Sequence, residues 1–261
     1  MVGGVGAEGF TPVTEAEVFD PETGVWSSAG VVLTSRAAHT ATLLVDGRVL
    51  VVGEDNLYEP NAELFDPATL AWTEAGSSAS PRFRHTVTLF TEGRVLVVGG
   101  ELTANGQPTD SVEIFDPSTD TWTSVVGLGT GRSRHSTVLL GDGRVMVAGG
   151  ASTSAAGPAG ELCSTEIFDP ASGTWTTGSS ACDARLGHRA IVSEAGRVIL
   201  LGAQNETEAL VTVTSYDPTT NRWVGATELE VGRVGAAASM LSDGGVLIVG
   251  GRGGPRNRSL R

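Results

Sequence analysis

The fold is decided by residues 115–149, whose sequence is FDPSTDTWTSVVGLGTGRSRHSTVLLGDGRVMVAG. An aromatic-Asp-Pro triplet opens this stretch, and a tryptophan follows six residues after the aspartate. An arginine lies ten residues beyond the tryptophan, a histidine three residues further, and the stretch closes on a glycine. The pattern occurs five times, with the triplets 46, 50, 53 and 48 residues apart. The triplets are Phe19-Asp20-Pro21, Phe65-Asp66-Pro67, Phe115-Asp116-Pro117, Phe168-Asp169-Pro170 and Tyr216-Asp217-Pro218.

All five tryptophans and all four histidines of the chain are confined to their own positions in this repeat. In the fifth copy Ala236 takes the place of the histidine. The closing glycine lies 34 positions after the aromatic residue in every copy, so the length varies only in the segment that follows. A rigid unit joined by one variable loop is typical of a packed structural repeat. The residues are Trp26, Trp72, Trp122, Trp175 and Trp223, with His39, His85, His135 and His188.

Each copy is expected to form four short strands, A to D. Strand A is expected around residues 39–44 and alternates polar and apolar residues, whereas strand B at 49–52 is apolar throughout, as in a buried central strand. In three copies an Asp-Gly pair between A and B supplies the positive φ of a tight turn: Asp46-Gly47, Asp142-Gly143 and Asp243-Gly244. Strand C ends in the aromatic residue and strand D carries the tryptophan. Between C and D a residue with left-handed backbone is expected, at Gly24, Leu70, Asp120, Gly173 and Asn221. Leu70 is the one residue among them that does not favour this conformation.

Four antiparallel strands repeated about every 50 residues are typical of a β-propeller blade. The sequence resembles the kelch family, because glycine pairs close strand B at Gly99-Gly100, Gly149-Gly150 and Gly250-Gly251, and the aromatic-Asp-Pro triplet and tryptophan follow. Two copies depart from it, with Glu54 and Ala203 as second residue of the pair. The resemblance, which extends to bacterial kelch-like proteins and to the central domain of galactose oxidase, implies an all-β, kelch-type β-propeller of five repeats with four-stranded antiparallel blades.

We expect one propeller over residues 1–251, followed by a basic tail at 252–261. The repeats lie around 1–53, 54–100, 101–150, 151–203 and 204–251. Five A–B hairpins and five C–D hairpins leave two arrangements open. The last A–B hairpin joins the first C–D hairpin in a five-bladed ring, or the chain is a truncated or open piece of a larger propeller with exposed edges.

Composition excludes several classes of partner. All 17 basic residues are arginine, against 30 acidic residues, so the net charge is −13 and a nucleic-acid-binding groove is not expected. The longest apolar runs are about four residues, far below the ~18 needed to span a bilayer, and the first residues do not form a signal peptide. For a longer parent protein, an extracellular or cell-envelope location is favoured.

One arginine begins strand A in all five copies, which makes these residues the candidate ligand-binding set. By resemblance to kelch propellers, the face formed by the B–C and D–A loops binds partners, and an arginine fork suits carboxylates. The alternative is that each arginine is neutralised within its own molecule. The set is Arg36, Arg82, Arg132, Arg185 and Arg233.

A glutamate stands two residues before the aromatic residue in four copies, and Thr214 replaces it in the fifth: Glu17, Glu63, Glu113, Glu166. The fifth copy also lacks the histidine and the arginine of the A–B hairpin, and Gly245 takes the place of that arginine. In the other copies the hairpin arginine is Arg48, Arg94, Arg144 or Arg197. The joint loss predicts that the glutamate of one blade contacts the histidine or hairpin arginine of the next. The alternative is an atypical terminal repeat.

The histidines are expected to form structural hydrogen bonds at the start of strand A. They do not suit a metal, because equivalent positions on packed sheets are ~10 Å apart, whereas Zn–N bonds are about 2.0–2.1 Å. Cys163 and Cys182 are expected near the open end of one C–D hairpin, where a disulfide is feasible and would imply an oxidising compartment. Two free cysteines are the alternative.

No catalytic constellation and no cofactor-binding motif is visible in the sequence. The tyrosine-based copper site of galactose oxidase is not visible either, since the only tyrosines are Tyr58 and Tyr216. We therefore expect a non-enzymatic scaffold that binds a protein or a carbohydrate through variable B–C loops, the longest at residues 151–163. The alternative is an accessory propeller of a secreted oxidase or carbohydrate-active enzyme.

Overall fold

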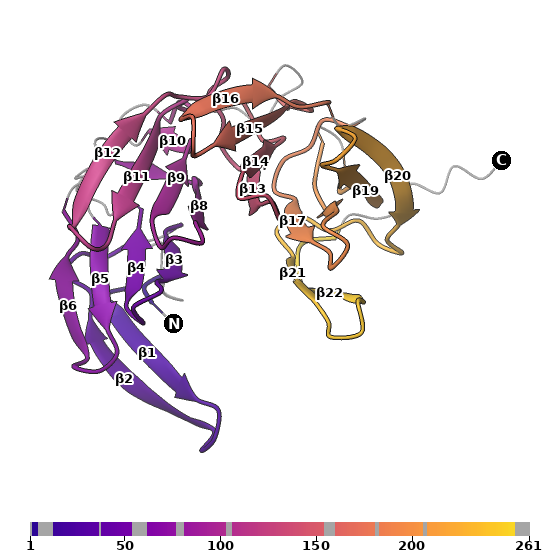
Figure 1. Cartoon of the computed structure of the whole chain (residues 1–261). Helices are drawn as coiled ribbons and strands as arrows, with labels where there is room; N and C mark the ends of the chain where they lie inside the picture. Colours follow the sequence, from indigo (N-terminus) through magenta and orange to yellow (C-terminus); the bar gives the residue numbers. More distant parts are fainter. Residues whose placement is uncertain are drawn as a thin grey trace. The chain divides into compact units, whose positions relative to one another are not determined.

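The structure, a computed structural model, describes residues 2–4, 13–36, 38–53, 62–76, 81–102, 106–153, 160–180, 183–205 and 208–253. The regular secondary structure of these residues is entirely β (Figure 1). The chain divides into two compact units, one of residues 1–107 and 111–125, the other of residues 108–110 and 126–261. Each unit is described by itself.

The first unit contains a two-stranded hairpin and two four-stranded blades. The N-terminal hairpin pairs β1 (Glu15–Asp20) with β2 (Val25–Val31). The first blade has the order β3 (Thr40–Leu43), β4 (Val49–Val52), β5 (Ala62–Asp66), β6 (Ala71–Glu74). The second blade has the order β8 (Thr86–Leu89), β9 (Val95–Val98), β11 (Val112–Asp116), β12 (Thr121–Val125). A small sheet pairs β7 (Arg82–Phe83) with β10 (Glu101–Leu102).

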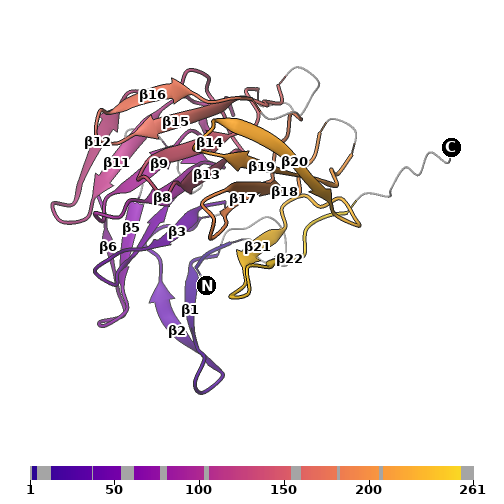
Figure 2. The same cartoon turned by 45° about the vertical axis from the view of Figure 1, so that its right-hand side comes forward.

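The second unit contains two more four-stranded blades and a second two-stranded hairpin. The third blade consists of β13 (Ser136–Leu139), β14 (Val145–Ala148), β15 (Thr165–Asp169) and β16 (Thr174–Thr177). The fourth consists of β17 (Arg189–Val192), β18 (Val198–Leu201), β19 (Thr212–Asp217) and β20 (Arg222–Glu228). The C-terminal hairpin pairs β21 (Ala237–Met240) with β22 (Val246–Val249). Figure 2 shows β21 beside β17, which it contacts.

Every blade has its four strands in the order A, B, C, D and paired antiparallel, which confirms the all-β, four-stranded antiparallel blade expected from the sequence. Within each unit the A strands of neighbouring sheets contact each other: β3 with β8, β13 with β17, and β17 with β21. Strands B and C are buried, and strand D is largely exposed. The A strands therefore form the inner side of each unit, and the D strands form its outer side.

The aromatic residue and the tryptophan of each repeat lie opposite each other on strands C and D. Phe115 pairs with Trp122 in register, and their ring centroids are 5.0 Å apart. In the first unit Phe115 packs on Leu64 and Val97 in a core shared by the first and second blades. Four tryptophans donate their indole N–H, at 2.7–2.9 Å, to a carbonyl 43–49 residues earlier: Trp72 to Ala29, Trp122 to Ala75, Trp175 to Val126 and Trp223 to Ser179.

The aspartate of each triplet closes the turn between strands C and D. In all five copies its carboxylate accepts a backbone N–H two residues on, at 2.8–2.9 Å. In the second blade, hydrogen bonds from the hydroxyl and the N–H of Ser118 lower the pKa of Asp116. The turn then needs a left-handed residue, and Leu70 adopts φ 57° there despite its side chain. The geometry of the turn, set by the aspartate, thus overrides the preference of leucine.

Candidate functional site

The arginine that begins strand A is the centre of a buried clamp inside each blade. In the second blade, Nη1 of Arg82 donates to the carbonyl oxygens of Gly99, at 3.3 Å, and Ser111, at 3.0 Å. Its Nη2 donates to Oγ of Ser111 at 2.9 Å and to the carboxylate of Glu113 at 2.5 Å. The side chain therefore ties the end of β9 to the beginning of β11. Burial lowers the pKa of Arg82, and the charge of Glu113 opposes that shift.

The first and third blades repeat this arrangement. Arg36 binds the carbonyl of Gly53 and the carboxylate of Glu63. Arg132 binds the carbonyl of Gly149 at 3.0 Å and the carboxylate of Glu166 at 2.6 Å. A Cβ at Gly149 would approach the carbonyl oxygen of Arg185 to 2.7 Å and Cε1 of His188 to 2.8 Å, so the closing glycine of strand B leaves room for the next repeat.

The fourth blade has Thr214 where the other three have the glutamate. Here Nη2 of Arg185 donates to Oγ1 of Thr212 at 3.2 Å and to the carboxylate of Asp183 at 3.2 Å. Asp183 is partly exposed, whereas the glutamates of the other blades are buried. The clamp is thus kept with a different carboxylate, one that lies two residues before the arginine.

Two expectations about these side chains are corrected by the structure. The first concerns the candidate ligand-binding arginines: Arg36, Arg82, Arg132 and Arg185 are at most 1 % exposed, and each is ion-paired to a carboxylate of its own blade. A guanidinium in that setting is not available to a ligand on the surface. Arg233 is half-buried, and its Nη1 donates to the carbonyl of Gly250 at 2.8 Å.

The second correction concerns the glutamates. Glu63, Glu113 and Glu166 bind the strand-A arginine of their own blade, rather than the histidine or hairpin arginine of the next one. The hairpin arginine has other partners. Arg48 binds Asp46 in its own turn and the carbonyl of Pro117 in the second blade.

The histidine connects neighbouring blades of a unit. Nε2 of His85 lies 3.0 Å from Oγ1 of Thr40, on the inner strand of the first blade. A Cβ at Gly53 would approach Cε1 of His85 to 3.1 Å, so the glycine that closes strand B leaves room for the imidazole. Burial, aided by the charge of Arg82, lowers the pKa of His85 to about 3. Burial and the charge of Arg185 do the same for His188.

The B–C loops are anchored by short strand pairs at their roots. In the first unit β7 pairs with β10, so residues 82–83 hold the start of the loop at 101–102. In the second unit Ala151 bridges both Ser133 and Glu161, and Gln204 bridges both Leu186 and Ala209. Val234 and Arg252 form a further bridge. The root of each of these loops is therefore held by the segment that precedes the histidine.

Two arginines next to these roots were not identified from the sequence. Arg84 and Arg134 precede the histidines of their repeats and have φ of 57° and 54°. Arg84 is partly exposed, lies over the ring of Phe83 at 4.8 Å, and pairs with Glu101 at 2.7 Å. The sequence signal that could have identified them is an arginine directly before the histidine, which two copies have. The backbone has positive φ at this position in every copy: Ala38, Arg84, Arg134, Gly187 and Gly235.

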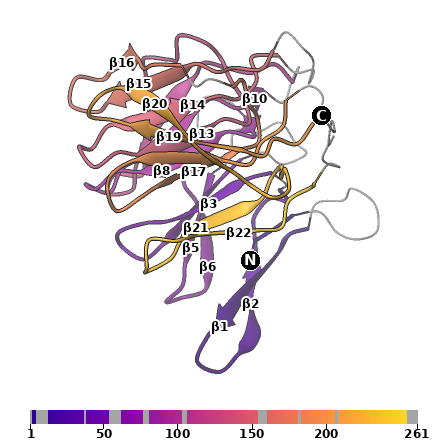
Figure 3. The same ribbon diagram turned by 90° about the vertical axis from the view of Figure 1, so that its right-hand side faces the viewer.

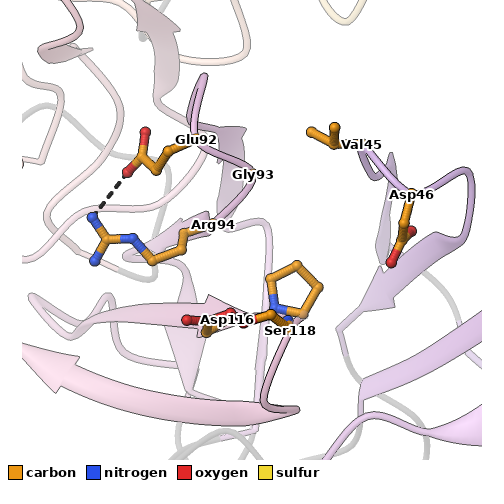
Figure 4. A pocket seen from close by; sticks show the side chains of 8 residues that line it. Val45, Asp46, Glu92, Gly93, Arg94, Asp116 and Ser118 are labelled. Carbon is orange, nitrogen blue, oxygen red and sulfur yellow. Dashed lines mark hydrogen bonds and ion pairs between the residues drawn. The ribbon is translucent and has the colours of Figure 1, made fainter.

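A cavity of about 470 Å³ lies at the A–B turns of the first two blades (Figure 4). Its charged side chains already have partners: Glu92 pairs with Arg94 at 2.8 Å, Asp46 with Arg48, and Asp116 with Ser118. It offers no polar group without a partner, so we do not assign a ligand to it. It is lined by Val45, Asp46, Glu92, Gly93, Arg94, Asp116, Pro117 and Ser118.

Other sequence-based candidates fall partly outside the described residues. Cys182 is outside them, so the disulfide with Cys163 stays a prediction, and Tyr58 and residues 154–159 of the longest B–C loop are outside as well. Within the part that is described, no three His, Cys, Asp or Glu side chains gather as a metal site would require. Nor does the described part contain a helix that is long and apolar enough to cross a membrane.

Comparison with known families gives one match. Residues 64–251, well over half of the chain, match the model of the KLHDC2/KLHL20/DRC7 Kelch-repeats domain. The matched region covers the second, third and fourth blades and the C-terminal hairpin, and of the first blade only the end of β5 and β6. No curated protein is similar enough to match the chain.

Proposed function

The chain belongs to the kelch-repeat family, and from that membership we propose that it is a binding module that holds a protein partner on the face built by its B–C and D–A loops. Kelch propeller domains are typically protein-binding scaffolds and usually non-catalytic. The matched family indicates no enzyme class.

The anchoring of the loop roots is the observation that carries this proposal. Ala151 pairs with Ser133 through both of its backbone hydrogen bonds, at 2.9 and 3.0 Å, so the B–C loop starts from a fixed backbone. Gln204 pairs in the same way with Leu186. Loops of variable length on a rigid scaffold are the usual carriers of recognition. Blades of constant length thus carry loops that differ in length from copy to copy.

Two arginine side chains at the loop roots favour acidic groups on the partner. The molecule as a whole has a net charge of −13. Arg84, which is partly exposed although it pairs with Glu101, brings a guanidinium group to a loop root of the first unit, and Arg134 brings one to a loop root of the second. Such groups bind carboxylates through paired hydrogen bonds. The clamp arginines do not contribute, because they are buried. We therefore propose a protein partner that presents acidic side chains.

The experiment is affinity capture with quantitative mass spectrometry, comparing the wild type, the double variant Arg84→Gln/Arg134→Gln and the control Arg94→Gln. The control removes one arginine from an A–B turn and leaves the loop roots intact. A partner should be retained by wild type and control and reduced at least tenfold for the double variant, with thermal unfolding midpoints alike.

Retention by the double variant combined with loss by the control would contradict the proposed face. Binding to a glycan array in place of any protein would reject the protein partner. Turnover of sugar substrates in the presence of copper would replace the proposal by an enzymatic role.

An extracellular location is proposed only through the cysteines. A disulfide between Cys163 and Cys182 would place the protein in an oxidising compartment. Intact-mass measurement of protein isolated from its source, before and after reduction, should show a gain of two protons. An unchanged mass would leave both thiols free and remove this support.

A further inference from the structure

One position of the repeat carries a charge in the fourth blade alone. The residue directly after the histidine is small in the other copies, whereas the fourth blade has Arg189 there. Arg189 is exposed and begins β17, the A strand that contacts both β13 and β21 (Figure 3). A guanidinium group therefore lies on the inner strand of the second unit, at the end where the D–A loop enters the blade. The residues at this position are Thr40, Thr86, Ser136, Arg189 and Ala237.

This position links neighbouring repeats of the second unit. Oγ of Ser136 donates to the carbonyl of His188 at 3.0 Å, and Nε of Arg189 donates to the carbonyl of Ala236 at 2.9 Å. In both cases the acceptor stands at the histidine position of the next repeat. Arg189 therefore keeps the link through its Nε alone, and the hydrogen bond fixes the plane of the guanidinium.

The other end of this guanidinium is available. Among the described residues, Nη1 and Nη2 of Arg189 form no hydrogen bond and no ion pair. By contrast, Arg144 on the A–B turn of the third blade pairs with Asp142 at 2.7 Å. The parallel N–H groups at the end of a guanidinium match the two oxygens of one carboxylate.

The backbone that precedes the histidines leaves the approach to Arg189 open. Gly187 donates its N–H to the carbonyl of Arg134 at 3.0 Å, and Gly235 donates its own to the carbonyl of Gly187 at 3.1 Å. These three residues thus form a continuous row at the loop end of the inner strands. Gly235, directly before Ala236, is exposed, and a Cβ there would meet no atom within 4 Å. At its two glycines the row has no side chain to cover the guanidinium.

The same row favours a carboxylate over a phosphate group. A phosphate presents three strong acceptor oxygens, but the N–H groups of Gly187 and Gly235 already donate to carbonyls. A carboxylate has two oxygens, which Nη1 and Nη2 of Arg189 can satisfy by themselves. Because the chain has a net charge of −13, it attracts an acidic group only where a guanidinium is not already neutralised.

We propose that Arg189 binds an aspartate or glutamate side chain of the protein partner, at the inner, loop end of the second unit. The carboxylate binds end-on to Nη1 and Nη2, while Nε stays on the carbonyl of Ala236. This inference rests on the proposed function and adds to it the side chain that selects the acidic group. It depends on neither Arg84 nor Arg134.

The test is fluorescence anisotropy with a labelled tetraglutamate peptide at constant ionic strength. Arg189→Gln keeps a polar side chain at an exposed position, and the matched control Arg144→Gln removes an arginine from an A–B turn of the same unit. Arg189→Gln should weaken binding at least about tenfold, because paired hydrogen bonds to a charged group are lost, and the control should weaken it less than about twofold. Circular dichroism and thermal unfolding verify the fold of both variants.

NMR locates the contact. The Nε–H signal of Arg189, assigned by its loss in Arg189→Gln, should shift on titration with tetraglutamate and stay in place with tetraglutamine. At equal ionic strength, inorganic phosphate should displace the peptide no better than acetate does. Better displacement by phosphate would overturn the choice of a carboxylate. An unshifted Arg189 signal in protein that binds tetraglutamate would overturn the site.

The outcomes separate this inference from the proposed function. Equal binding of tetraglutamate by wild type and Arg189→Gln, or no binding by the wild type, overturns the role of Arg189. The proposed face then still stands if Arg84→Gln/Arg134→Gln loses the captured protein. Binding of tetraglutamate through Arg189 by a wild type that captures no protein would instead support the carboxylate site and reject the proposed function.

Discussion

At the scale of the residue, Leu70 shows how strongly the turn between strands C and D is specified. Its backbone is left-handed although leucine does not favour that conformation, and the equivalent positions carry glycine, aspartate or asparagine. Asp66 holds the turn through the N–H of Ala68, at 2.8 Å. The left-handed backbone therefore stores strain that a different residue would relieve.

Leu70→Gly is expected to raise the free energy of unfolding by about 0.5–1 kcal/mol, because glycine adopts positive φ without a steric cost. The side chain of Leu70 is exposed, so little apolar burial is lost. Urea denaturation measures the effect. The control is Leu43→Gly, at an exposed position of β3, which should lower the free energy of unfolding by about 1 kcal/mol. If both glycine variants have a lower free energy of unfolding than the wild type, the backbone at Leu70 is not strained.

The buried histidines make stability depend on pH. His85 and His188 have a folded-state pKa of about 3, against 6.5 in an unfolded chain. Above about pH 6.5 both imidazoles are neutral in the folded and in the unfolded chain, so they do not lower the free energy of unfolding. As the pH falls below that value, only the unfolded chain binds protons, so the free energy of unfolding decreases until the folded pKa is reached. The slope approaches about 1.4 kcal/mol per pH unit for each histidine.

Urea denaturation between about pH 7 and about pH 5, a range chosen to stay above most carboxylate titration, tests this dependence. The double variant His85→Ala/His188→Ala should be less stable at neutral pH and lose less stability on acidification. Alanine is the residue that the fifth repeat already carries, at Ala236. Equal slopes for wild type and variant would show that the two imidazoles do not remain neutral in the folded state.

At the scale of the element, the buried clamp holds strands B and C together at the loop end of each blade. Removing one partner of a buried ion pair leaves an uncompensated charge and costs about 3–5 kcal/mol. Glu113→Gln should therefore destabilise the protein by about 3 kcal/mol, since the amide keeps one hydrogen bond but not the charge.

The matched control is Glu92→Gln, which breaks the exposed pair with Arg94 and should change stability by less than about 1 kcal/mol. Urea denaturation of both variants gives the comparison. Similar small losses at the two sites would mean that Glu113 is not the counter-charge of Arg82.

The blades could be predicted from the sequence, and the clamp could not. The spacing of Asp116, Trp122 and Gly149 is set by local turns and strand lengths, so it was visible as a repeat. The partner of Glu113 depends on how Arg82 packs against the ends of β9 and β11, and sequence spacing does not contain that information. The joint absence of three polar residues in the fifth copy suggested a blade-to-blade pair, whereas Arg185 keeps its clamp through Asp183.

At the scale of the whole molecule, the repeats differ mainly in what covers their aromatic residues. Four tryptophans donate to a carbonyl of an earlier repeat, and Trp26 does not within the described residues. The proposed binding of an acidic protein partner follows instead from the loop roots.

The most direct test of equivalent, stacked repeats is hydrogen exchange of the five indole N–H groups, followed by NMR. Four indole signals should be protected, those of Trp72, Trp122, Trp175 and Trp223, and the signal of Trp26 should exchange at the rate of an exposed indole. Equal exchange of all five, or protection of Trp26 with exposure of any of the other four, would contradict the account.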